Sequence, residues 1–363
     1  MLESLKEKVF ERNKNADDIS DMPMWRMGMS LTATWAWGIS IAIGITIMHS
    51  KGMAPFLIWV IPNILAIPFF ALVHAKLPGV SEWPKWRPFL LFILSVIVYA
   101  IIMNMQFINL ALSSGTDLAT FQFLSSAHST YAVIGVALGI ALFINKTGFR
   151  GSVLTDIGQY GIQVFGATAL IIAGLIMGTR ADVVWLVEGT SNWWLSWSAL
   201  STLFAIMTHG GEWQRLQSLN TESDKLRAGA YGGLFFGLYM ILVAGAGLVF
   251  TGNFVLSLLF LIIVLSVATS SLDSSISAAQ WIFQQFDRSA YWGTAFAVLV
   301  ILLWPYAIQS SIMDFYQLIS DIRMKLIGGL LGITAVYAAT RSERFNELLV
   351  KYRVLREEKT IDT

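Results

Sequence analysis

Residues 269–275 read TSSLDSS and place several hydroxyl groups and one carboxylate inside an otherwise apolar stretch. All of these potential ligands are oxygen atoms, which hard cations such as sodium prefer. Serine and threonine hydroxyls can instead donate hydrogen bonds to carbonyls of their own helix, so the hydroxyl cluster has two interpretations. Asp273 favours the cation interpretation, because a carboxylate surrounded by lipid or apolar protein needs a partner or an ion.

Two further stretches combine small or polar residues with aromatic ones. Residues 30–40 (SLTATWAWGIS) pair small side chains with two tryptophans, which suits either a close seam between helices or the wall of a solute pathway. Residues 208–215 (THGGEWQR) contain a glycine pair near the end of an apolar segment. Paired glycines can interrupt a membrane helix at a binding site, or they can simply end the helix.

The chain contains no recognisable catalytic constellation. No HExxH, GxSxG or P-loop pattern occurs, and the four histidines are too scattered to form a metal site. The lack of cysteine excludes disulfides and thiol chemistry. His128 and His209 could relay protons, although a core histidine is the simpler interpretation of each. We therefore expect no enzyme activity and no organic cofactor.

The composition indicates that membrane helices must position these residues. Of the 363 residues, 56% are hydrophobic and only 13% are charged, whereas a soluble domain carries about 25% charged residues. The mean hydropathy of +0.65 points the same way. With 24 basic and 23 acidic residues, the chain offers no basic surface for nucleic acid. The sequence therefore predicts a polytopic membrane protein in contact with the lipid bilayer.

A spanning helix needs about 20 apolar residues. The sequence predicts ten such helices, at 27–48, 53–73, 88–112, 120–144, 155–178, 193–211, 228–250, 253–283, 290–310 and in a segment ending near residue 340. Residues 1–26 lack the apolar core of a signal peptide. With this N-terminal segment in the cytoplasm, all but four of the 24 lysines and arginines lie in cytoplasmic segments. We expect a cell membrane protein (inner or plasma membrane) with both termini cytoplasmic, a core at 27–340 and a charged tail at 341–363.

Four stretches, in matching order, resemble the sodium:solute symporter family. They are residues 23–34 (PMWRMGMSLTAT), 150–159 (RGSVLTDIGQ), 213–215 (WQR) and 270–274 (SSLDS). The resemblance implies an all-α, LeuT-type fold in which ten helices form a 5+5 inverted repeat, here at about 27–178 and 193–340. Most members have additional helices before and after this core.

The resemblance also implies a sodium site between the first and eighth helices. Backbone carbonyls of Ala33, Ala36 and Val267 and the hydroxyls of Ser270 and Ser271 would bind the ion. An unwound stretch in the first helix would free the carbonyls for this purpose. Sodium would thus be the coupling ion, and no other metal is expected.

Some family members hold a second sodium ion on an aspartate of the fifth helix and later serines of the eighth. The matching residues here are Asp156, Asp273 and Ser274, where many members have a small neutral residue in place of Asp273. This second site could equally bind a proton.

The family's substrate cavity lies beside the first sodium site. Residues expected to border it are Trp35, Trp37, Ser40 and Gln317. Two aromatic rings with a few polar groups suit a small, partly apolar organic solute. Three charged residues lie near the start of the predicted tenth helix: Asp321, Arg323 and Lys325. Either Arg323 or Lys325 binds an anionic solute, with Asp321 as its partner in the empty site, or all three lie at the outer end of the helix.

These observations support two hypotheses about function. The first is sodium-coupled uptake of a small organic solute by alternating access. The second is a sensor or structural subunit of a larger membrane complex, derived from a transporter. The short ten-helix core, the charged tail and the 14 tryptophans motivate this second hypothesis and would imply a partner in the membrane.

Overall fold

The computed structural model describes residues 17–19, 21–75, 97–114, 126–179, 184–187, 203–249 and 253–309. Within these ranges every regular element is a helix. Four helices are long and apolar enough to cross a membrane: Met53–Ala75, Ser129–Ile176, Glu222–Val249 and Phe254–Gln285. The predicted all-helical membrane protein is thereby confirmed, while the tenth predicted span lies outside the described residues.

The first predicted span, 27–48, is divided into two helices. Helix α2 (Met24–Trp35) ends at Ala36, and α3 (Gly38–Lys51) begins after Trp37. Trp37 has an extended backbone (φ −76°, ψ 152°), so the helical hydrogen-bond ladder cannot pass through this point. The break lies between two bulky tryptophan side chains, both of which are buried.

Helices α4 (Met53–Ala75) and α6 (Ile97–Ser114) fall within the second and third predicted spans to within a few residues. Residues 88–96 of the third span lie outside the described residues. Two prolines inside α4, Pro62 and Pro68, remove amide donors from its ladder without ending the helix.

The fourth and fifth predicted spans join in one long element, α7 (Ser126–Ile176). Its two parts meet at Gly148, which has a positive φ (62°) that few other residues tolerate. The predicted loop at 145–154 is therefore almost entirely helical. Asp17 stabilises the start of the second part, because its carboxylate accepts a hydrogen bond (3.1 Å) from the amide of Phe149.

The sixth predicted span is interrupted at His209. A short 3₁₀ turn, η3 (Ile206–Thr208), is followed by an extended His209 and then by α9 (Gly210–Gln217). The glycine pair thus begins a helix, and the predicted end at residue 211 is six residues short of the observed one. Residues 193–202 lie outside the described residues.

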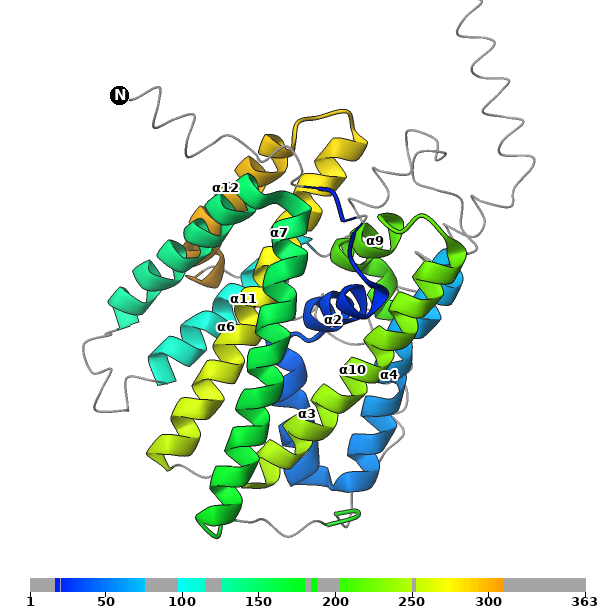
Figure 1. Cartoon of the computed structure of the whole chain (residues 1–363). Helices are drawn as coiled ribbons and strands as arrows, with labels where there is room; N and C mark the ends of the chain where they lie inside the picture. Colours follow the sequence, from blue (N-terminus) through cyan, green and yellow to red (C-terminus); the bar gives the residue numbers. More distant parts are fainter. Residues whose placement is uncertain are drawn as a thin grey trace, which may run out of the picture.

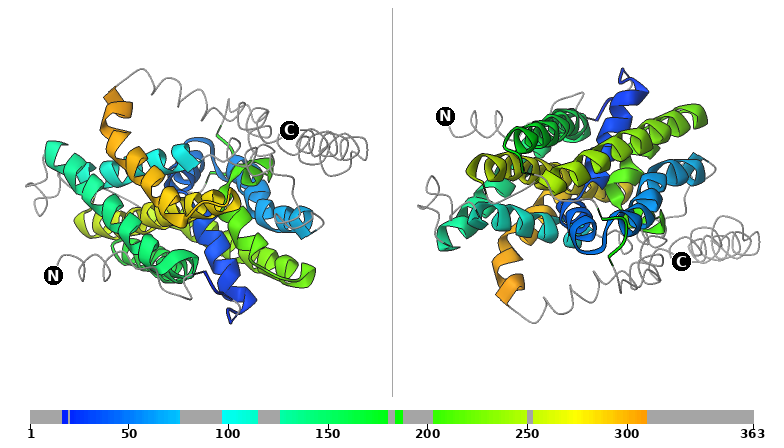
Figure 2. Two further views of the ribbon diagram at one scale, coloured as in Figure 1. Left: turned by 90° about the horizontal axis from the view of Figure 1, so that it is seen from above. Right: turned by 90° about the horizontal axis from the view of Figure 1, so that it is seen from below.

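The last described helices agree closely with the predicted spans. They are α10 (Glu222–Val249), α11 (Phe254–Gln285) and α12 (Ala290–Gln309). Helix α11 packs against α7, α6 and α12, and α10 packs against α2 and α4. Helix α2 lies between α7 and α10 (Figure 1), and the end views show that one end of it reaches the edge of the bundle (Figure 2).

Two glycines allow α2 to lie directly against α10. A Cβ added at Gly28 would collide with the Cβ of Tyr231, and one at Gly232 would lie 3.4 Å from the Cβ of Leu31 in α2. Thr32 donates a hydrogen bond (2.8 Å) to the carbonyl of Gly232 across this contact. One face of residues 30–40 is therefore a close helix seam, as one of the two interpretations of that stretch proposed.

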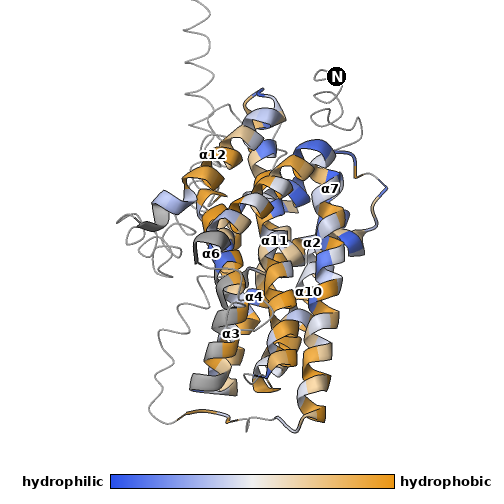
Figure 3. Ribbon diagram, turned by 90° about the vertical axis from the view of Figure 1, so that its left-hand side faces the viewer, coloured by the Kyte–Doolittle hydropathy of each residue, from blue (hydrophilic) through white to orange (hydrophobic). Residues whose placement is uncertain are grey.

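Hydrophobic residues cover long outward faces of the bundle (Figure 3). Large apolar side chains such as Phe165 and Ile176 are 76% and 81% exposed. Apolar patches of this extent are costly in water and are expected where lipid is the surrounding solvent. Many polar residues of α2, α9 and α11 are instead buried in the interior, where they form the site described next.

Candidate ion and substrate site

The break after α2 frees two backbone carbonyls. In a continuous helix, the amides of Trp37 and Ser40 would donate to the carbonyls of Ala33 and Ala36. They donate instead to the carbonyls of Trp35 and Trp37, at 3.0 and 2.8 Å. The carbonyl oxygens of Ala33 and Ala36 therefore lack these helical partners and are open to other donors or to a cation.

Two serines of α11 face these carbonyls. The hydroxyl of Ser270 lies 3.4 Å from the Ala33 oxygen, and that of Ser271 lies 3.4 Å from the Ala36 oxygen. Both distances are long for an O–H···O bond, which is usually about 2.7–2.8 Å. The shorter contacts of these hydroxyls run elsewhere, from Ser270 to Asp156 (2.9 Å) and from Ser271 to the Val267 carbonyl (3.1 Å).

The structure thus brings together all five residues predicted to bind the first sodium ion. Each is buried. Since each hydroxyl has a single proton and a nearer acceptor, neither carbonyl of the broken helix receives a strong hydrogen bond from these serines. The result is a set of oxygen atoms that includes two poorly satisfied carbonyls.

A second buried cluster centres on Asp156 of α7. Its Oδ2 accepts hydrogen bonds from Arg215 Nη2 (2.5 Å) and from the Ser30 hydroxyl (2.5 Å). Its Oδ1 accepts from the hydroxyls of Ser270 (2.9 Å) and Ser274 (3.2 Å). The carboxylate is completely buried and has four donors, so its charge is well stabilised.

Arg215 of α9 extends this cluster with its remaining donors. Its Nε donates to the hydroxyl of Ser30 (2.7 Å), its Nη2 to that of Ser274 (2.9 Å), and its Nη1 to the carbonyl of Gly211 (3.0 Å). The sequence comparison used Arg215 only as part of the WQR stretch and did not place it in a site. A fully buried arginine always requires an anionic partner, and that requirement is the signal that could have identified it.

Asp273 of α11 joins the same cluster. It accepts hydrogen bonds from the hydroxyls of Thr155 (2.6 Å) and Ser152 (3.2 Å). The hydroxyl of Ser274 lies 3.2 Å from both Asp273 and Asp156, and its single proton can be donated to either carboxylate. The three residues predicted to form a second ion or proton site, Asp156, Asp273 and Ser274, therefore lie together. The described part of the cluster holds two carboxylates and one guanidinium group.

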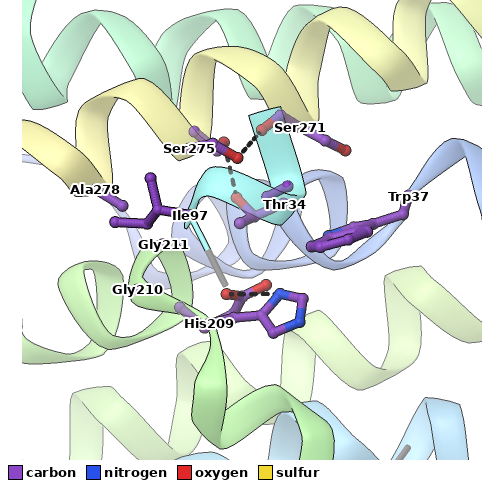
Figure 4. A pocket seen from close by; sticks show the side chains of 12 residues that line it. Thr34, Trp37, Ile97, His209, Gly210, Gly211, Ser271, Ser275 and Ala278 are labelled. Atoms are coloured by element: carbon purple, nitrogen blue, oxygen red, sulfur yellow. Dashed lines mark hydrogen bonds and ion pairs between the residues drawn. The ribbon is translucent and has the colours of Figure 1, made fainter. Parts of the chain in front are cut away.

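A pocket lies on the other side of the α2 break. It is narrow, and it is open on one side rather than enclosed. Residues of α2, α6, α9 and α11 border it together with Trp37 and His209, and Figure 4 shows Ser271 and Ser275 of α11 across from His209. Trp37, one of the residues predicted to border the substrate cavity, borders this pocket.

Two other predicted cavity residues, Trp35 and Ser40, do not border this pocket. The ring of Trp35 contacts that of His209, with centroids 5.1 Å apart, so it lies behind the pocket wall. Ser40 is buried but does not border this pocket. Gln317 lies outside the described residues, as do the charges of the tenth predicted span: Asp321, Arg323 and Lys325.

Glu212 borders the pocket and was not predicted. Its carboxylate is completely buried, and neither oxygen has a hydrogen-bond partner among the described residues. Nδ1 of His209 lies 3.8 Å from one of its oxygen atoms, and the two form an ion pair only when the imidazole is protonated. His209 itself lies in the pocket wall between two tryptophans, whereas the side chain of His128 lies outside the described residues.

Solved structures of transporters share this fold. The chain aligns with a Na+-coupled sialic acid symporter in a substrate-bound, outward-open state with a TM-score of 0.60 and 15% identity, over 94% of this chain and 85% of that one. A manganese transporter of Eremococcus coleocola, in complex with an aromatic bis-isothiourea compound, aligns with a TM-score of 0.60 and 14% identity, over 88% and 80% of the two chains. No protein-family model and no curated protein matches the sequence. The chain therefore has a transporter fold, and its structural neighbours are transporters rather than enzymes.

Proposed function

We propose that the protein is a sodium-coupled secondary transporter of a small organic solute. In this proposal ten membrane helices form two inverted repeats of five, in the arrangement of the sodium:solute symporters. The protein lies in the inner or plasma membrane of the cell, and both of its termini are cytoplasmic. The Na+-coupled neighbour supports sodium as the coupling ion, although the manganese transporter has the same fold.

The observation that carries the proposal is the pair of poorly satisfied carbonyls at the α2 break. Ala33 and Ala36 have lost their helical amide donors, and the hydroxyls of Ser270 and Ser271 lie beside them. Unsatisfied carbonyls inside a membrane protein are costly, and a bound sodium ion would compensate for this cost. Val267 would complete the site with its own carbonyl.

Alternating access would follow from the position of the two helix breaks. Ala36–Trp37 and His209 both adjoin the same pocket, so a solute in it contacts both repeats. In transporters of this type, broken helices surround the binding site and one bundle moves relative to the other. Sodium bound between α2 and α11 would hold these two elements together and thereby favour one state over the other.

The Asp156 cluster is proposed as a second coupling site. The side chains of Asp156, Asp273 and Ser274 provide five oxygen atoms as possible ligands. The guanidinium group of Arg215 neutralises only one of the two carboxylates if both are ionised. A further proton or sodium ion would balance the remaining charge.

Thermal unfolding of the purified protein in sodium and potassium salts tests the first site. A cation that binds only the native state raises its stability by mass action. We expect sodium to raise the unfolding temperature of the wild type relative to potassium at the same ionic strength. The variant Ser257→Ala, a control substitution in the first turn of α11, should show the same increase. The double variant Ser270→Ala/Ser271→Ala should lose the sodium-specific increase.

The same sodium effect in the double variant would contradict the assignment of these residues. The lack of any sodium effect in the wild type would instead favour the second hypothesis, a transporter-derived sensor or structural subunit. That hypothesis further requires a partner that copurifies at a fixed ratio in mild detergent.

A further inference from the structure

The pocket beside the two helix breaks contains one carboxyl group for which the described residues provide no hydrogen bond. Glu212 lies in the first turn of α9, and its carboxylate borders the pocket. It is completely buried, and neither of its oxygen atoms has a donor within hydrogen-bond distance among the described residues. A buried polar group in this state usually marks either a cost to stability or the place of a missing ligand.

The charged groups around Glu212 do not neutralise it. Arg215, one turn further along α9, directs its guanidinium group to Asp156 and to the hydroxyls around that residue. Asp156 and Asp273 carry the same charge sign as Glu212 and would repel it. His209 lies 3.8 Å away, beyond hydrogen-bond distance, and its ring is packed against Trp37 with a centroid distance of 4.6 Å.

The rest of the pocket wall is suited to a positive group of low hydration. Trp37 borders the pocket, and the ring of Tyr99 lies next to it at a centroid distance of 5.8 Å. Aromatic faces attract organic cations, because the face of the ring carries a partial negative charge. A carboxylate next to an aromatic face is the arrangement that recognises ammonium head groups.

A sodium ion would fit this pocket less well than it fits the α2–α11 site. Sodium prefers several oxygen ligands, and these are gathered at Ala33, Ala36 and the two serines. The pocket adds hydroxyl groups of Thr34, Ser271 and Ser275 to the single carboxylate. Hydroxyls of this kind can accept or donate hydrogen bonds to the polar part of an organic solute.

The geometry points to a small organic cation as the transported solute, with its ammonium group bound between Glu212 and Trp37. This inference rests on the proposed transport function and names the class of solute. An ammonium group in the pocket would stabilise the ionised form of the Glu212 carboxyl group, and Trp37 supplies the aromatic face. The hydroxyls on α11 contact the remainder of the solute.

Ethanolamine and ethylene glycol form a suitable pair of probes. They have the same number of heavy atoms and differ by a positive ammonium group in place of a neutral hydroxyl. We expect millimolar ethanolamine to raise the unfolding temperature of the wild type, and ethylene glycol at the same concentration to leave it unchanged. Choline and its neutral analogue 3,3-dimethylbutan-1-ol extend the comparison to a larger head group.

The substitution Glu212→Gln keeps the shape of the side chain and removes its charge. The ethanolamine concentration that gives half of the maximal increase in unfolding temperature should be at least tenfold higher for this variant than for the wild type. Glu222→Gln, an exposed position in the first turn of α10, is the matched control and should leave this concentration unchanged. Trp37→Leu, which removes only the aromatic face, should raise it severalfold.

The sodium-dependent stability increase is measured on the same samples and separates the two proposals. If sodium stabilises wild type and Glu212→Gln alike but neither ethanolamine nor choline stabilises the wild type, the inference is overturned and the transport proposal stands. Equal binding of ethanolamine by wild type and Glu212→Gln also overturns the inference. A Glu212-dependent ethanolamine effect without a sodium effect supports the inference and contradicts sodium coupling.

Discussion

Two completely buried carboxylates lie near α9, and their surroundings differ sharply. Asp156 accepts hydrogen bonds from Arg215 and from three serine hydroxyls. Glu212 borders a pocket and has no hydrogen-bond donor among the described residues. The hydrogen bonds of Asp156 fix α2, α7, α9 and α11 relative to one another. The carboxyl group of Glu212 can instead bind a ligand that enters the pocket.

The short helix α9 takes part in both arrangements, because it carries Arg215, the partner of Asp156, as well as Glu212. A satisfied buried charge contributes to a unique arrangement of helices, whereas an unsatisfied one lowers stability until a ligand compensates for it. Transport requires both properties, because the ion and solute sites must be held in place and must also respond to occupation. The predictions below test whether the two carboxylates differ in this way.

Replacement of Arg215 by methionine should have the largest effect on stability. It leaves Asp156 and Asp273 buried close together with no cation between them among the described residues. Loss of one partner from a buried ion pair costs about 3–5 kcal/mol. Chemical unfolding in mixed micelles would measure the loss, and the double variant Asp156→Asn/Arg215→Met should recover a large part of it. A loss below about 1 kcal/mol in the single variant would contradict the assigned role of Arg215.

Gly211 lies between the two regions, and its substitution by alanine should affect both. The added Cβ would lie 2.8 Å from the Thr34 methyl group and 3.4 Å from Nη1 of Arg215. Thr34 borders the pocket and also contacts Ser274 (3.1 Å), so its displacement disturbs the cluster as well. Overpacking of this kind costs about 1–3 kcal/mol.

The control for this change is Gly135→Ala in α7, where an added Cβ meets nothing within 4 Å. It should leave stability unchanged or raise it by up to about 1 kcal/mol, since alanine is the better helix former. Equal effects of the two alanine variants would show that the space around Gly211 is not restrictive.

Glu212→Gln should leave stability unchanged or raise it by about 1 kcal/mol, because it removes a buried carboxyl group that has no hydrogen-bond donor among the described residues. The same change from acid to amide at Asp156 should instead lower stability by about 3–5 kcal/mol, because it deprives Arg215 of its anionic partner. Unfolding of the two variants under identical conditions therefore tests the comparison directly. A loss of similar size in both would mean that Glu212 has a structural partner of its own.

The sequence predicted the long apolar helices well, since length and hydropathy decide which segments can cross lipid. It did not locate the element boundaries at polar segments. Residues 145–154 contain two basic residues and two glycines and resemble a loop, yet they are helical on both sides of Gly148 because tertiary contacts such as the one from Asp17 stabilise them. The exact break at Ala36–Trp37 likewise depends on packing around the tryptophans.

The sequence predicted the part of the candidate site that consists of consecutive oxygen-bearing residues. It did not predict the part that depends on contacts between residues far apart in the chain. Residues 269–275 were recognised because several hydroxyls and a carboxylate follow one another. Arg215 and Glu212 are single charges next to a glycine pair, and such charges usually lie at the end of a helix in contact with water. Only the structure shows that both are buried, and that Arg215 lies against a carboxylate 59 positions earlier in the chain.

The smallest effect is expected at the exposed counterpart of the buried ion pair. Asp21 and Arg150 form a two-pronged contact of 2.7 and 2.9 Å, but the Asp21 side chain is 64% exposed. Solvent and salt screen such pairs, so Asp21→Asn should leave the unfolding temperature almost unchanged at physiological salt.

The pH dependence of this small effect has a definite sign. The hydrogen bond from Arg150 lowers the pKa of Asp21 below its ordinary value of 3.8. Any stabilisation by the pair is therefore complete above that value and disappears as the pH falls through the lowered pKa of the folded state. Unfolding temperatures of wild type and Asp21→Asn should converge below pH 4. A clear difference between them at neutral pH, resistant to high salt, would show that this surface pair holds the N-terminal segment against α7 as firmly as Arg215 holds Asp156.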